Sequence, residues 1–546
     1  MASMFGKTAL GARADRPGRP WRRTAVAAGV LLALAARAAL AQDGASAFAQ
    51  AVADAAAGDP AISAFYRQTG YAPLWTDAAD ADRRAAFFAA LAGADDQGLP
   101  AARYDRDGLM ARLQSAQTER DRARLEVDLT RDFLLYAHDV HSGVLVPGQV
   151  DEDLKRVVPQ VDRLQELTAF AAADPAAYLA ALPPQTPEYA ELLKAKLTLE
   201  HLAADDAWGA PVAARTLKPG QTGPDVVALR DRLTRMGYLP PTSAASFDEE
   251  MTAAVMQFQA DHGITPDGVA GPATMAEINL QPDDRLKAVI VALERWRWMP
   301  ADLGARHVWV NLPDFSAKLI DDGKVTFETP AVVGKNAKDM RTPEFSDVMR
   351  YMDVNPTWNV PRSIVTKEYL PALQQDPTAD GQLELIDSRG QVVDRSTVDF
   401  SQYDADTFPY ELKQPPSDGN ALGLVKFMFP NKYNIYLHDT PTKYLFKREV
   451  RAFSHGCIRL AKPFDFAYAL LGPQSSDPQG TFKAALDRKV ENVLNLEAPV
   501  PVHLVYFTAV PTPTGKMTYR RDIYGRDAEI FAALAKAGVA LRVKAN

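Results

Sequence analysis

Residues 433–460 read YNIYLHDTPTKYLFKREVRAFSHGCIRL, and this stretch contains the single cysteine of the chain, Cys457. Its first residues alternate between polar and apolar side chains and end at His438. Such alternation is typical of a β-strand with one face on the core, and it predicts Asn434, Tyr436 and His438 on the opposite face. A lone thiol with a histidine to activate it is the minimal equipment for nucleophilic acyl transfer. The stretch therefore predicts a cysteine nucleophile in a β-rich setting.

The histidine that activates the thiol is the first chemical question. A free thiol has a pKa of about 8.5 and is largely protonated at neutral pH. An imidazole either takes its proton or forms a thiolate–imidazolium pair with it. We favour His438 over His455, because His455 is only two residues from Cys457 and is better placed to shape the loop. Gly456 lets the backbone turn, so amide groups around Gly456 and Cys457 are candidates for an oxyanion hole.

The spacing from His438 to the motif Ser454-His455-Gly456-Cys457-x-Arg459 resembles the active-site signature of the L,D-transpeptidases. These are cysteine enzymes that cross-link or decorate bacterial peptidoglycan. The resemblance makes His438 the base and assigns the third group of the triad to a backbone carbonyl just after it, here that of Asp439. Arg459 occupies the family's arginine position, where it either grips a substrate carboxylate or braces the loop. The remaining substrate-binding candidates are Ser454, His455, Tyr436 and Trp358, with core packing an equal alternative for the last two.

The remainder of the 546 residues supports a multidomain α+β protein. Apolar content of 47% and charged content of 24% are ordinary for globular proteins, and the net charge of −8 argues against nucleic-acid binding. Residues 42–214 are alanine-rich with helical spacing, whereas residues beyond 305 show strand patterns, including a hairpin with the turn Asp321-Asp322-Gly323.

Several strings extend the family resemblance to the large, Gram-negative type with a scaffold. They include Tyr71-Ala72-Pro73-Leu74-Trp75, Glu294-Arg295-Trp296-Arg297-Trp298, Gly237-Tyr238-Leu239, Arg341-Thr342-Pro343 and Asn355-Pro356-Thr357-Trp358. After a signal peptide (1–41), which the amino-terminal residues themselves predict, the resemblance implies a helical scaffold domain (42–214), a small three-helix peptidoglycan-binding module (215–280), a scaffold return helix or linker (281–304), and a mostly β catalytic domain (305–546) with an inserted lid (362–420). The alternatives are that the module is only a spacer and that the insertion has no catalytic role.

The amino terminus predicts export to the periplasm. A basic region precedes a short apolar stretch, and Ala39-Leu40-Ala41 is an A-x-A cleavage site. The apolar stretch is shorter than the roughly 20 residues that span a membrane, although an uncleaved anchor is the alternative. We expect no stable membrane span after cleavage. An unpaired cysteine in an oxidising compartment is either buried and inert or kept for its reactivity.

The leading functional hypothesis is peptidoglycan L,D-transpeptidation, which makes 3–3 cross-links between diaminopimelate residues of tetrapeptide stems. The same site also suits an L,D-carboxypeptidase or cross-link hydrolase if water is the acceptor, or a lipoprotein-attaching transferase if a protein lysine is. A non-enzymatic peptidoglycan-binding scaffold is the third class. The family resemblance implies that a carbapenem acylates Cys457. No cofactor and no metal are expected.

Overall fold

The computed structural model describes residues 47–541, so the predicted signal peptide lies outside the described range. The chain forms two compact units. The first contains residues 47–93, 101–139 and 160–182, and the second contains residues 94–100, 140–159 and 183–541. No helix within the described range is both long enough and apolar enough to cross a membrane.

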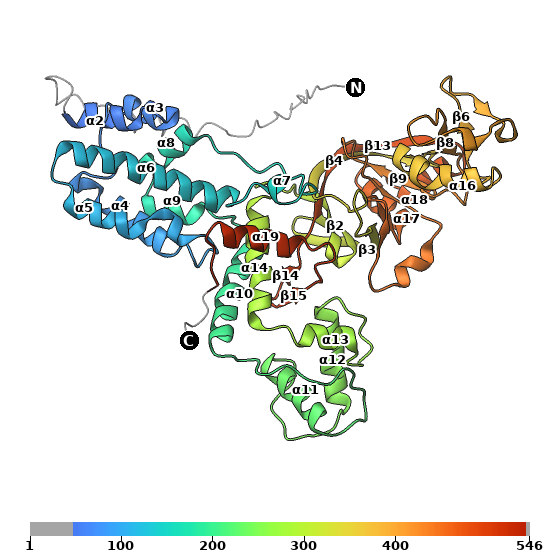
Figure 1. Ribbon diagram of the computed structural model, residues 1–546, viewed down its shortest axis with the longest axis horizontal. Coiled ribbons are helices and arrows are strands. Elements are labelled where there is room, and N and C mark those ends of the chain that lie inside the picture. The colour runs from blue at the N-terminus through green and yellow to red at the C-terminus, as the bar shows by residue number, and fades with distance from the viewer. Residues whose placement is uncertain (1–46, 542–546) are drawn as a thin grey trace, which may run out of the picture. The chain divides into compact units, whose positions relative to one another are not determined.

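The first unit is helical, as the sequence predicts for this region (Figure 1). An aromatic cluster of Trp75, Phe87, Phe133 and Phe170 fills its core. Asp59 caps α3 by accepting hydrogen bonds from its first amides, and Pro60 begins the helix. The helices are α2 (Ala47–Ala56), α3 (Pro60–Gln68), η1 (Ala78–Asp80), α4 (Ala81–Ala92), η2 (Ala101–Tyr104), α5 (Arg106–Ser115), α6 (Glu119–Ser142), α8 (Arg163–Ala172) and α9 (Pro175–Ala181).

The second unit contains further helices that share a core with its β-structure. Leu199, Leu286, Phe507 and Ile530 lie in this common buried cluster. The helix predicted near residues 282–300 is present as α14, and it packs against α10 and α19. The helices are α7 (Pro147–Val150), α10 (Pro187–Ala204), α14 (Pro282–Arg297) and α19 (Arg526–Lys536). Residues 183–214 thus pack with the β-rich part of the second unit rather than with the first unit, where the sequence had placed them.

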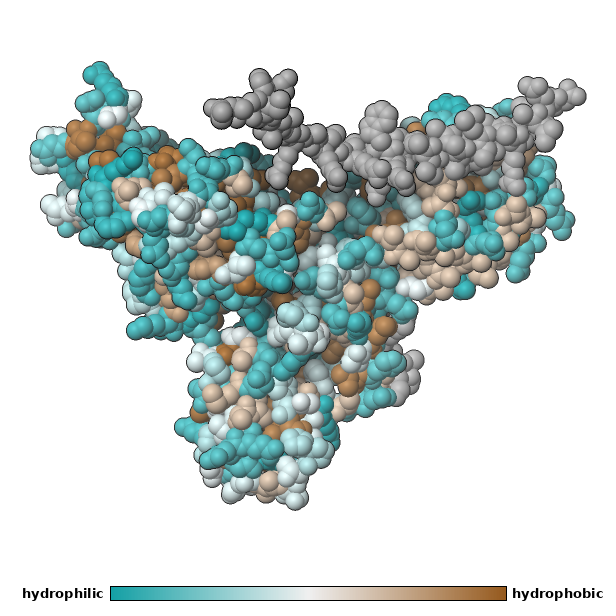
Figure 2. Space-filling view, turned by 180° about the vertical axis from the view of Figure 1, so that it is seen from behind, coloured by the Kyte–Doolittle hydropathy of each residue, from teal (hydrophilic) through white to brown (hydrophobic). Residues whose placement is uncertain are grey.

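The predicted three-helix module is also present. Its helices α11 (Pro224–Arg235), α12 (Glu249–Asp261) and α13 (Pro272–Ile278) enclose a buried apolar cluster of their own. Each begins with proline or follows an acidic cap, as for Asp248, whose carboxylate accepts a hydrogen bond from the Met251 amide. The module's surface mixes hydrophilic side chains with small hydrophobic patches (Figure 2).

A nine-stranded sheet forms the centre of the β-rich part of the second unit, in the order β11-β3-β12-β10-β9-β4-β13-β1-β2. The long strand β3 pairs with β2 through its first half and with β12 and β11 through its second half, so the sheet closes on itself. The strands are β1 (Arg306–Asn311), β2 (Ser316–Asp321), β3 (Lys324–Gly334), β4 (Phe345–Val354), β9 (Val425–Met428), β10 (Leu437–His438), β11 (Ala452–Ser454), β12 (Ile458–Leu460) and β13 (Asn492–Val505).

The inner face of this sheet is apolar and holds the core, with α17 and α18 packed beside it. The remaining elements are η3 (Leu312–Asp314), η7 (Lys443–Lys447), α17 (Pro463–Leu471), α18 (Pro478–Leu486) and the small hairpin β14 (Ala509–Pro511) and β15 (Met517–Tyr519). The predicted hairpin is confirmed: Asp321 pairs with Lys324, and Asp322 and Gly323 both have positive φ, as a two-residue turn of this kind requires.

One strand prediction is wrong in extent. The segment before His438 was expected to be extended from residue 433, but only Leu437–His438 forms a strand. Asn434 has φ of 56°, and the side-chain oxygen of Asn431 accepts hydrogen bonds from the amides of Tyr433 and Ile435. The Asn431 side chain thus replaces a strand partner and bends the chain. Asn434 therefore does not share an extended face with Tyr436 and His438.

The predicted insertion, residues 362–420, folds together with residues 358–361 around a small apolar core of its own. It contains a four-stranded sheet in the order β5-β8-β6-β7 and one interrupted helix (Figure 1). The elements are β5 (Trp358–Asn359), α15 (Arg362–Ile364), the π-helical turn η4 (Val365–Tyr369), α16 (Leu370–Gln375), β6 (Glu384–Ile386), β7 (Val392–Val393), η5 (Arg395–Thr397), η6 (Phe400–Gln402) and β8 (Glu411–Gln414).

Candidate active site

The parallel pair β10 and β12 brings four candidate side chains to one face of the sheet. Leu437 pairs with Ile458, and both are buried in the core. Side chains alternate along a strand, so the residues before and after this pair lie on the opposite face. These residues are Tyr436, His438, Cys457 and Arg459. We call them the active face.

His438 is held by backbone carbonyls. Its imidazole is 4% exposed, and Nδ1 lies 2.5 Å from the carbonyl oxygen of Asp439. In the neutral ring this contact places the proton on Nδ1, which leaves Nε2 as the basic nitrogen. Burial and the nearby positive charge of Arg459 lower the pKa of His438 to about 3, although hydrogen bonds to the carbonyls of Asp439 and Leu422 oppose this shift. The imidazole is therefore neutral at physiological pH.

The carboxylate of Asp439 is occupied elsewhere. It accepts hydrogen bonds from the amides of Thr440 (2.7 Å) and Leu424 (2.9 Å) and from Lys443 Nζ (2.5 Å). Gly423 makes this possible, because a Cβ at that residue would lie 2.3 Å from the Asp439 carboxyl carbon. Asp439 thus faces His438 with its carbonyl while its side chain ties β10 to the loop before β9.

The nucleophile loop, residues 454–457, is closed by its own serine. Ser454 Oγ donates to the Cys457 carbonyl (2.5 Å) and accepts from the Gly456 amide (3.2 Å). Gly456 has φ of 110°, a conformation that strongly favours glycine. The expectation that the Gly456 amide serves an oxyanion hole needs correction, because that amide is already bonded. Among residues 47–541 the Cys457 amide has no hydrogen-bond partner, and it remains as the candidate donor.

Cys457 is half-buried, and its sulfur contacts polar groups of the preceding segment. Sγ lies 3.5 Å from the Asn434 carbonyl oxygen. Burial raises the pKa of the Cys457 thiol to about 11, while hydrogen bonds to Tyr436 and the charges of Arg459 and Lys426 act in the opposite direction. Burial and the same thiol raise the pKa of Tyr436 well above its usual value. Cys457 is thus a neutral thiol at rest.

His438 and Cys457 are diagonal neighbours on the active face. Within the described part of the chain no hydrogen bond joins them. The thiol instead contacts the Asn434 carbonyl and Tyr436, and the Tyr436 ring packs edge-on against His438 with the ring centroids 5.7 Å apart. With both groups neutral, the resting site contains an uncharged thiol and an uncharged imidazole. This arrangement favours proton transfer during attack over a preformed thiolate–imidazolium pair.

Positive charge lines the active face. Arg459 is half-buried, its Nη1 donates to Thr442 Oγ1 (3.1 Å), and no carboxylate of residues 47–541 forms an ion pair with it. Burial lowers the pKa of Arg459, which marks its guanidinium as poorly solvated. Lys426 lies opposite His438 on β9 and pairs with Asp353 on β4 at 2.8 Å. Arg459 is therefore a cation with unused hydrogen-bond donors that could bind a substrate carboxylate.

The other predicted site residues lie at the edge of the loop or in the insertion. His455 Nε2 contacts Glu368 Oε1 at 2.5 Å, and Glu368 comes from the π-helical turn η4. Trp358 packs in the core of the insertion against Tyr369 rather than against the thiol. The structure thus brings Ser454 and His455 to the nucleophile and leaves Trp358 outside the active face.

Sequence reasoning missed three contributors to the site. Thr342 hydrogen-bonds the Gly456 carbonyl, Glu368 contacts His455, and Lys426 lies beside His438. Of these three, only Thr342 lies in a sequence string that resembles the family, Arg341-Thr342-Pro343. Among the described residues no group of three histidine, cysteine, aspartate or glutamate side chains is arranged to hold a metal ion.

Comparison with protein families identifies three domains in the chain. Residues 60–195 match a scaffold domain, residues 222–278 match a "putative peptidoglycan binding domain", and residues 305–480, which include the whole active face, match the L,D-transpeptidase catalytic domain. A curated relative from Haemophilus influenzae, named "putative L,D-transpeptidase", is 33% identical over 228 residues, which are 41% of this chain and 45% of the relative.

Two solved structures of L,D-transpeptidases also align with the chain. The protein from Xylanimonas cellulosilytica is 17% identical, with 54% of this chain and 99% of that chain covered and a TM-score of 0.16. The protein from Stackebrandtia nassauensis is 16% identical, with 54% and 97% covered and a TM-score of 0.21. Such low scores carry no argument, so the assignment rests on the domain matches. The chain thus contains regions similar to an L,D-transpeptidase catalytic domain, a scaffold domain and a peptidoglycan-binding domain, and it spans less than half the length of the curated relative that it matches.

Proposed function

We propose that this protein is a peptidoglycan L,D-transpeptidase that forms 3–3 cross-links through a thioester on Cys457. The observation that carries the proposal is the active face, where three groups lie together on two adjacent strands: a thiol, a neutral histidine, and a cation that forms no ion pair with any residue of 47–541. The domain match supports the reaction class. The identity of the acceptor, and hence of the cross-link that is formed, is what we propose beyond that match.

In the acylation step, Cys457 Sγ attacks the carbonyl carbon at the L-centre of diaminopimelate in a donor tetrapeptide. His438 Nε2 takes the thiol proton as the carbon–sulfur bond forms, and the Asp439 carbonyl stabilises the imidazolium through Nδ1. The Cys457 amide donates to the oxyanion of the tetrahedral intermediate. Collapse breaks the carbon–nitrogen bond, and the imidazolium returns its proton to the departing D-alanine amine.

In the second step, the side-chain amine of diaminopimelate on a neighbouring stem attacks the thioester. His438 takes a proton from that amine, the carbon–sulfur bond breaks, and the thiol of Cys457 is restored. His438 starts neutral in both steps, as a base must. Arg459 would hold a donor carboxylate in bidentate fashion, with Tyr436, Ser454 and His455 lining the rest of the donor site.

The insertion would act as a lid on this site. Its support is the contact between Glu368 on η4 and His455, next to the nucleophile, together with a second pair, Lys367 and Asp339, at 3.3 Å. A π-helical turn often marks a functional position in a helix. Closure over the thioester would exclude water and favour an amine acceptor over hydrolysis.

A peptidoglycan substrate would require the protein to act outside the cytoplasm, and we propose that the export signal expected at residues 1–41 directs it to the periplasm. The module at 215–280 would raise the local enzyme concentration at the wall, since linked binding sites gain avidity in this way. Deleting it should then weaken action on intact sacculi more than action on soluble stems. A carbapenem would acylate Cys457 through the same oxyanion site.

Incubation of the mature protein with purified muropeptides, analysed by mass spectrometry, tests the proposal. A 3–3 linked dimer and free D-alanine are expected, and Cys457→Ala should give neither. Tripeptide without dimer would identify a carboxypeptidase or hydrolase, and attachment to a lipoprotein lysine would identify a lipoprotein-attaching transferase. Binding to sacculi with no turnover would leave a peptidoglycan-binding scaffold and would overturn the enzymatic proposal.

A further inference from the structure

The orientation of the peptide bond between Gly456 and Cys457 decides whether the Cys457 amide can donate a hydrogen bond to the oxyanion. A trans peptide is planar, so its C=O and N–H point in opposite directions and turn together. Whatever holds the Gly456 carbonyl therefore also sets the direction of the Cys457 amide. The next peptide is fixed separately, because Ser454 Oγ donates to the Cys457 carbonyl at 2.5 Å.

The side chain of Thr342 holds the Gly456 carbonyl by a hydrogen bond. Its Oγ1 donates to Gly456 O at 2.7 Å and accepts from the Gly334 amide at 2.9 Å, so both bonding directions of the hydroxyl are used. The side chain is completely buried. A buried hydroxyl with a donor and an acceptor partner cannot rotate without breaking one bond, so the Gly456 carbonyl has a fixed partner.

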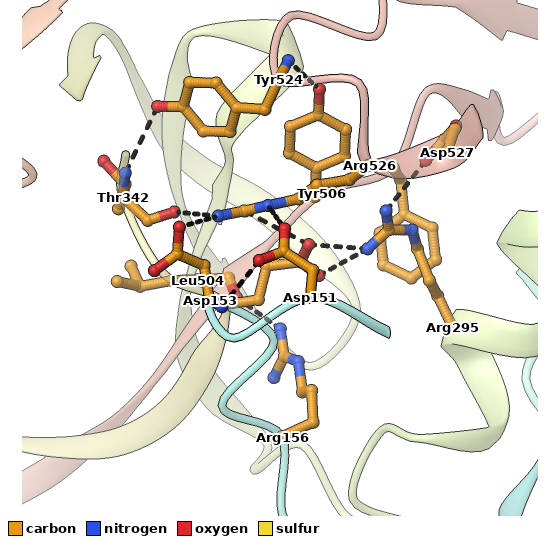
Figure 3. Close-up of polar contacts among 12 residues, drawn as sticks. Asp151, Asp153, Arg156, Arg295, Thr342, Leu504, Tyr506, Tyr524, Arg526 and Asp527 are labelled. Atoms are coloured by element: carbon orange, nitrogen blue, oxygen red, sulfur yellow. Dashed lines mark hydrogen bonds and ion pairs between the residues drawn. The ribbon is translucent and has the colours of Figure 1, made fainter. Parts of the chain in front are cut away.

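The backbone of Thr342 is in turn fixed by a buried cluster, drawn in Figure 3. Arg526 Nη2 donates to the Thr342 carbonyl at 3.0 Å, and the Thr342 amide donates to the Tyr524 hydroxyl at 3.4 Å. The Tyr524 hydroxyl then donates to the Gly334 carbonyl at 2.5 Å. Thr342 is thus anchored through its amide, its carbonyl and its hydroxyl.

Arg526 gives this cluster its rigidity. It is fully buried, lies beside the stacked rings of Tyr506 and Tyr524, and pairs with Asp151 (3.1 Å), Asp153 (3.4 Å) and Glu344 (3.4 Å). These carboxylates are supplied by residues 140–159 and by the start of β4. Figure 3 shows the guanidinium at the centre of these groups, with Thr342 at one side.

We propose that Thr342 is a positioning residue that aims the Cys457 amide at the oxyanion, with Arg526 and Tyr524 holding it in place. Thr342 touches neither the substrate nor the sulfur; it acts through the peptide plane. The inference rests on the proposed role of Cys457 as the nucleophile. It extends the site from the loop to a residue more than a hundred positions earlier in the chain.

The test compares two reactions of the same thiol. Alkylation by iodoacetamide occurs at a saturated carbon and develops no oxyanion, whereas acylation by a donor tetrapeptide or a carbapenem does. Thr342→Val keeps the shape and removes the hydroxyl, and it should slow acylation roughly 10- to 100-fold while alkylation changes less than about twofold, since one oxyanion donor is worth about 10²–10³ in rate. Thr342→Ser retains the hydroxyl and should keep most of the acylation rate.

Equal losses in both reactions would mean that Thr342 only supports the loop, and unchanged acylation in Thr342→Val, or an equal loss in Thr342→Ser, would also overturn the inference. If Thr342→Val does not fold, as thermal unfolding would show, Tyr524→Phe applies the same test with a smaller loss of acylation. An unchanged ratio of acylation to alkylation in that variant would refute the proposal. If the wild-type thiol is alkylated but never acylated, the proposed function fails instead.

Discussion

Arg459 and Arg526 belong to the same compact unit of the chain, but their surroundings are opposite in kind. Arg526 is fully buried among three carboxylates, two aromatic rings and a backbone carbonyl. Arg459 has one hydroxyl partner and no ion pair among the described residues. An arginine with satisfied bonds supports structure, and a poorly solvated arginine with spare donors is ready for a ligand.

The same contrast separates two regions, the active face and the Arg526 cluster. The active face holds a thiol and an imidazole that burial keeps uncharged, so its chemistry begins only when a substrate arrives. The cluster holds charges that are already compensated. Substitutions on the active face should therefore reduce activity and spare stability, whereas substitutions in the cluster should reduce stability first.

The largest expected effect is on the active face. His438→Ala should lower the rate of acyl transfer by roughly 10²–10⁴-fold, because general-base help is lost, with the fold intact. Muropeptide turnover and thermal unfolding measure the two quantities. His201→Ala, at an exposed position on α10, is the matched control and should retain full activity. Activity that survives in His438→Ala but not in His455→Ala would transfer the role of base to His455.

Arg526→Met should be the most destabilising change in the cluster. Removing the cation leaves Asp151 and Glu344 buried without full compensation, which costs about 3–5 kcal/mol in comparable cases. Urea unfolding measures the loss. Arg521→Met removes a partly exposed arginine that pairs with Glu449, and it should cost less than about 1 kcal/mol. Similar losses in the two variants would show that the cluster carries no special stability.

The pH dependence of alkylation reports the charge state of the active face. Because the pKa of Cys457 is raised to about 11, its thiolate is scarce at neutral pH. The rate with iodoacetamide should rise about tenfold per pH unit, or about 100-fold from pH 7 to 9. The denatured protein should level off near the ordinary thiol pKa of about 8.5. A native rate that is already constant below pH 7 would instead indicate a thiolate–imidazolium pair.

Arg459→Lys tests whether the spare donors of Arg459 bind substrate. Lysine keeps the charge but loses the planar fork, so kcat/KM for the donor should fall about tenfold, mainly through KM. Stability should change by less than about 0.5 kcal/mol. A donor whose terminal D-alanine is amidated should be insensitive to the substitution if that carboxylate is the partner. Equal losses with both donors, together with lower stability, would make Arg459 a brace for the loop.

The smallest effect is expected at the contact between the insertion and the loop. Glu368→Gln weakens the bond to His455 by about 1 kcal/mol or less, because the pair is partly exposed. The ratio of hydrolysed tripeptide to cross-linked dimer should then rise a few-fold. Glu384→Gln, at an exposed position of β6, is the control. An unchanged ratio in Glu368→Gln would leave the insertion without a role in acceptor choice.

Sequence patterns predicted the parts of the site that are local in the chain. The loop around Cys457 is a contiguous motif, and the hairpin at Asp322 and Gly323 is fixed by two residues that adopt positive φ. Alternation failed at Asn434, because the Asn431 side chain takes over the backbone hydrogen bonds of that segment. A two-residue period does not reveal such a side-chain turn.

The parts that sequence could not predict depend on long-range packing. Nothing in the local sequence shows that Thr342 lies under Gly456 or that Glu368 reaches His455. Nor does composition distinguish Arg526 from the other arginines, because its burial results from carboxylates elsewhere in the chain. The sequence motif does not indicate whether the Gly456 amide has a hydrogen-bond partner. The structure shows that this amide donates to Ser454 Oγ.

The ion pair between Asp151 and Arg526 joins residues 375 positions apart. This separation determines when the catalytic part can mature. During synthesis, residues 140–159 emerge long before α19, so Asp151 has no Arg526 partner until α19 has been made. Long-range contacts of this kind slow folding, because the intervening chain must be ordered first. Completion of the Arg526 cluster thus depends on α19, and a truncated chain that lacks α19 would leave the Thr342 carbonyl without its Arg526 partner.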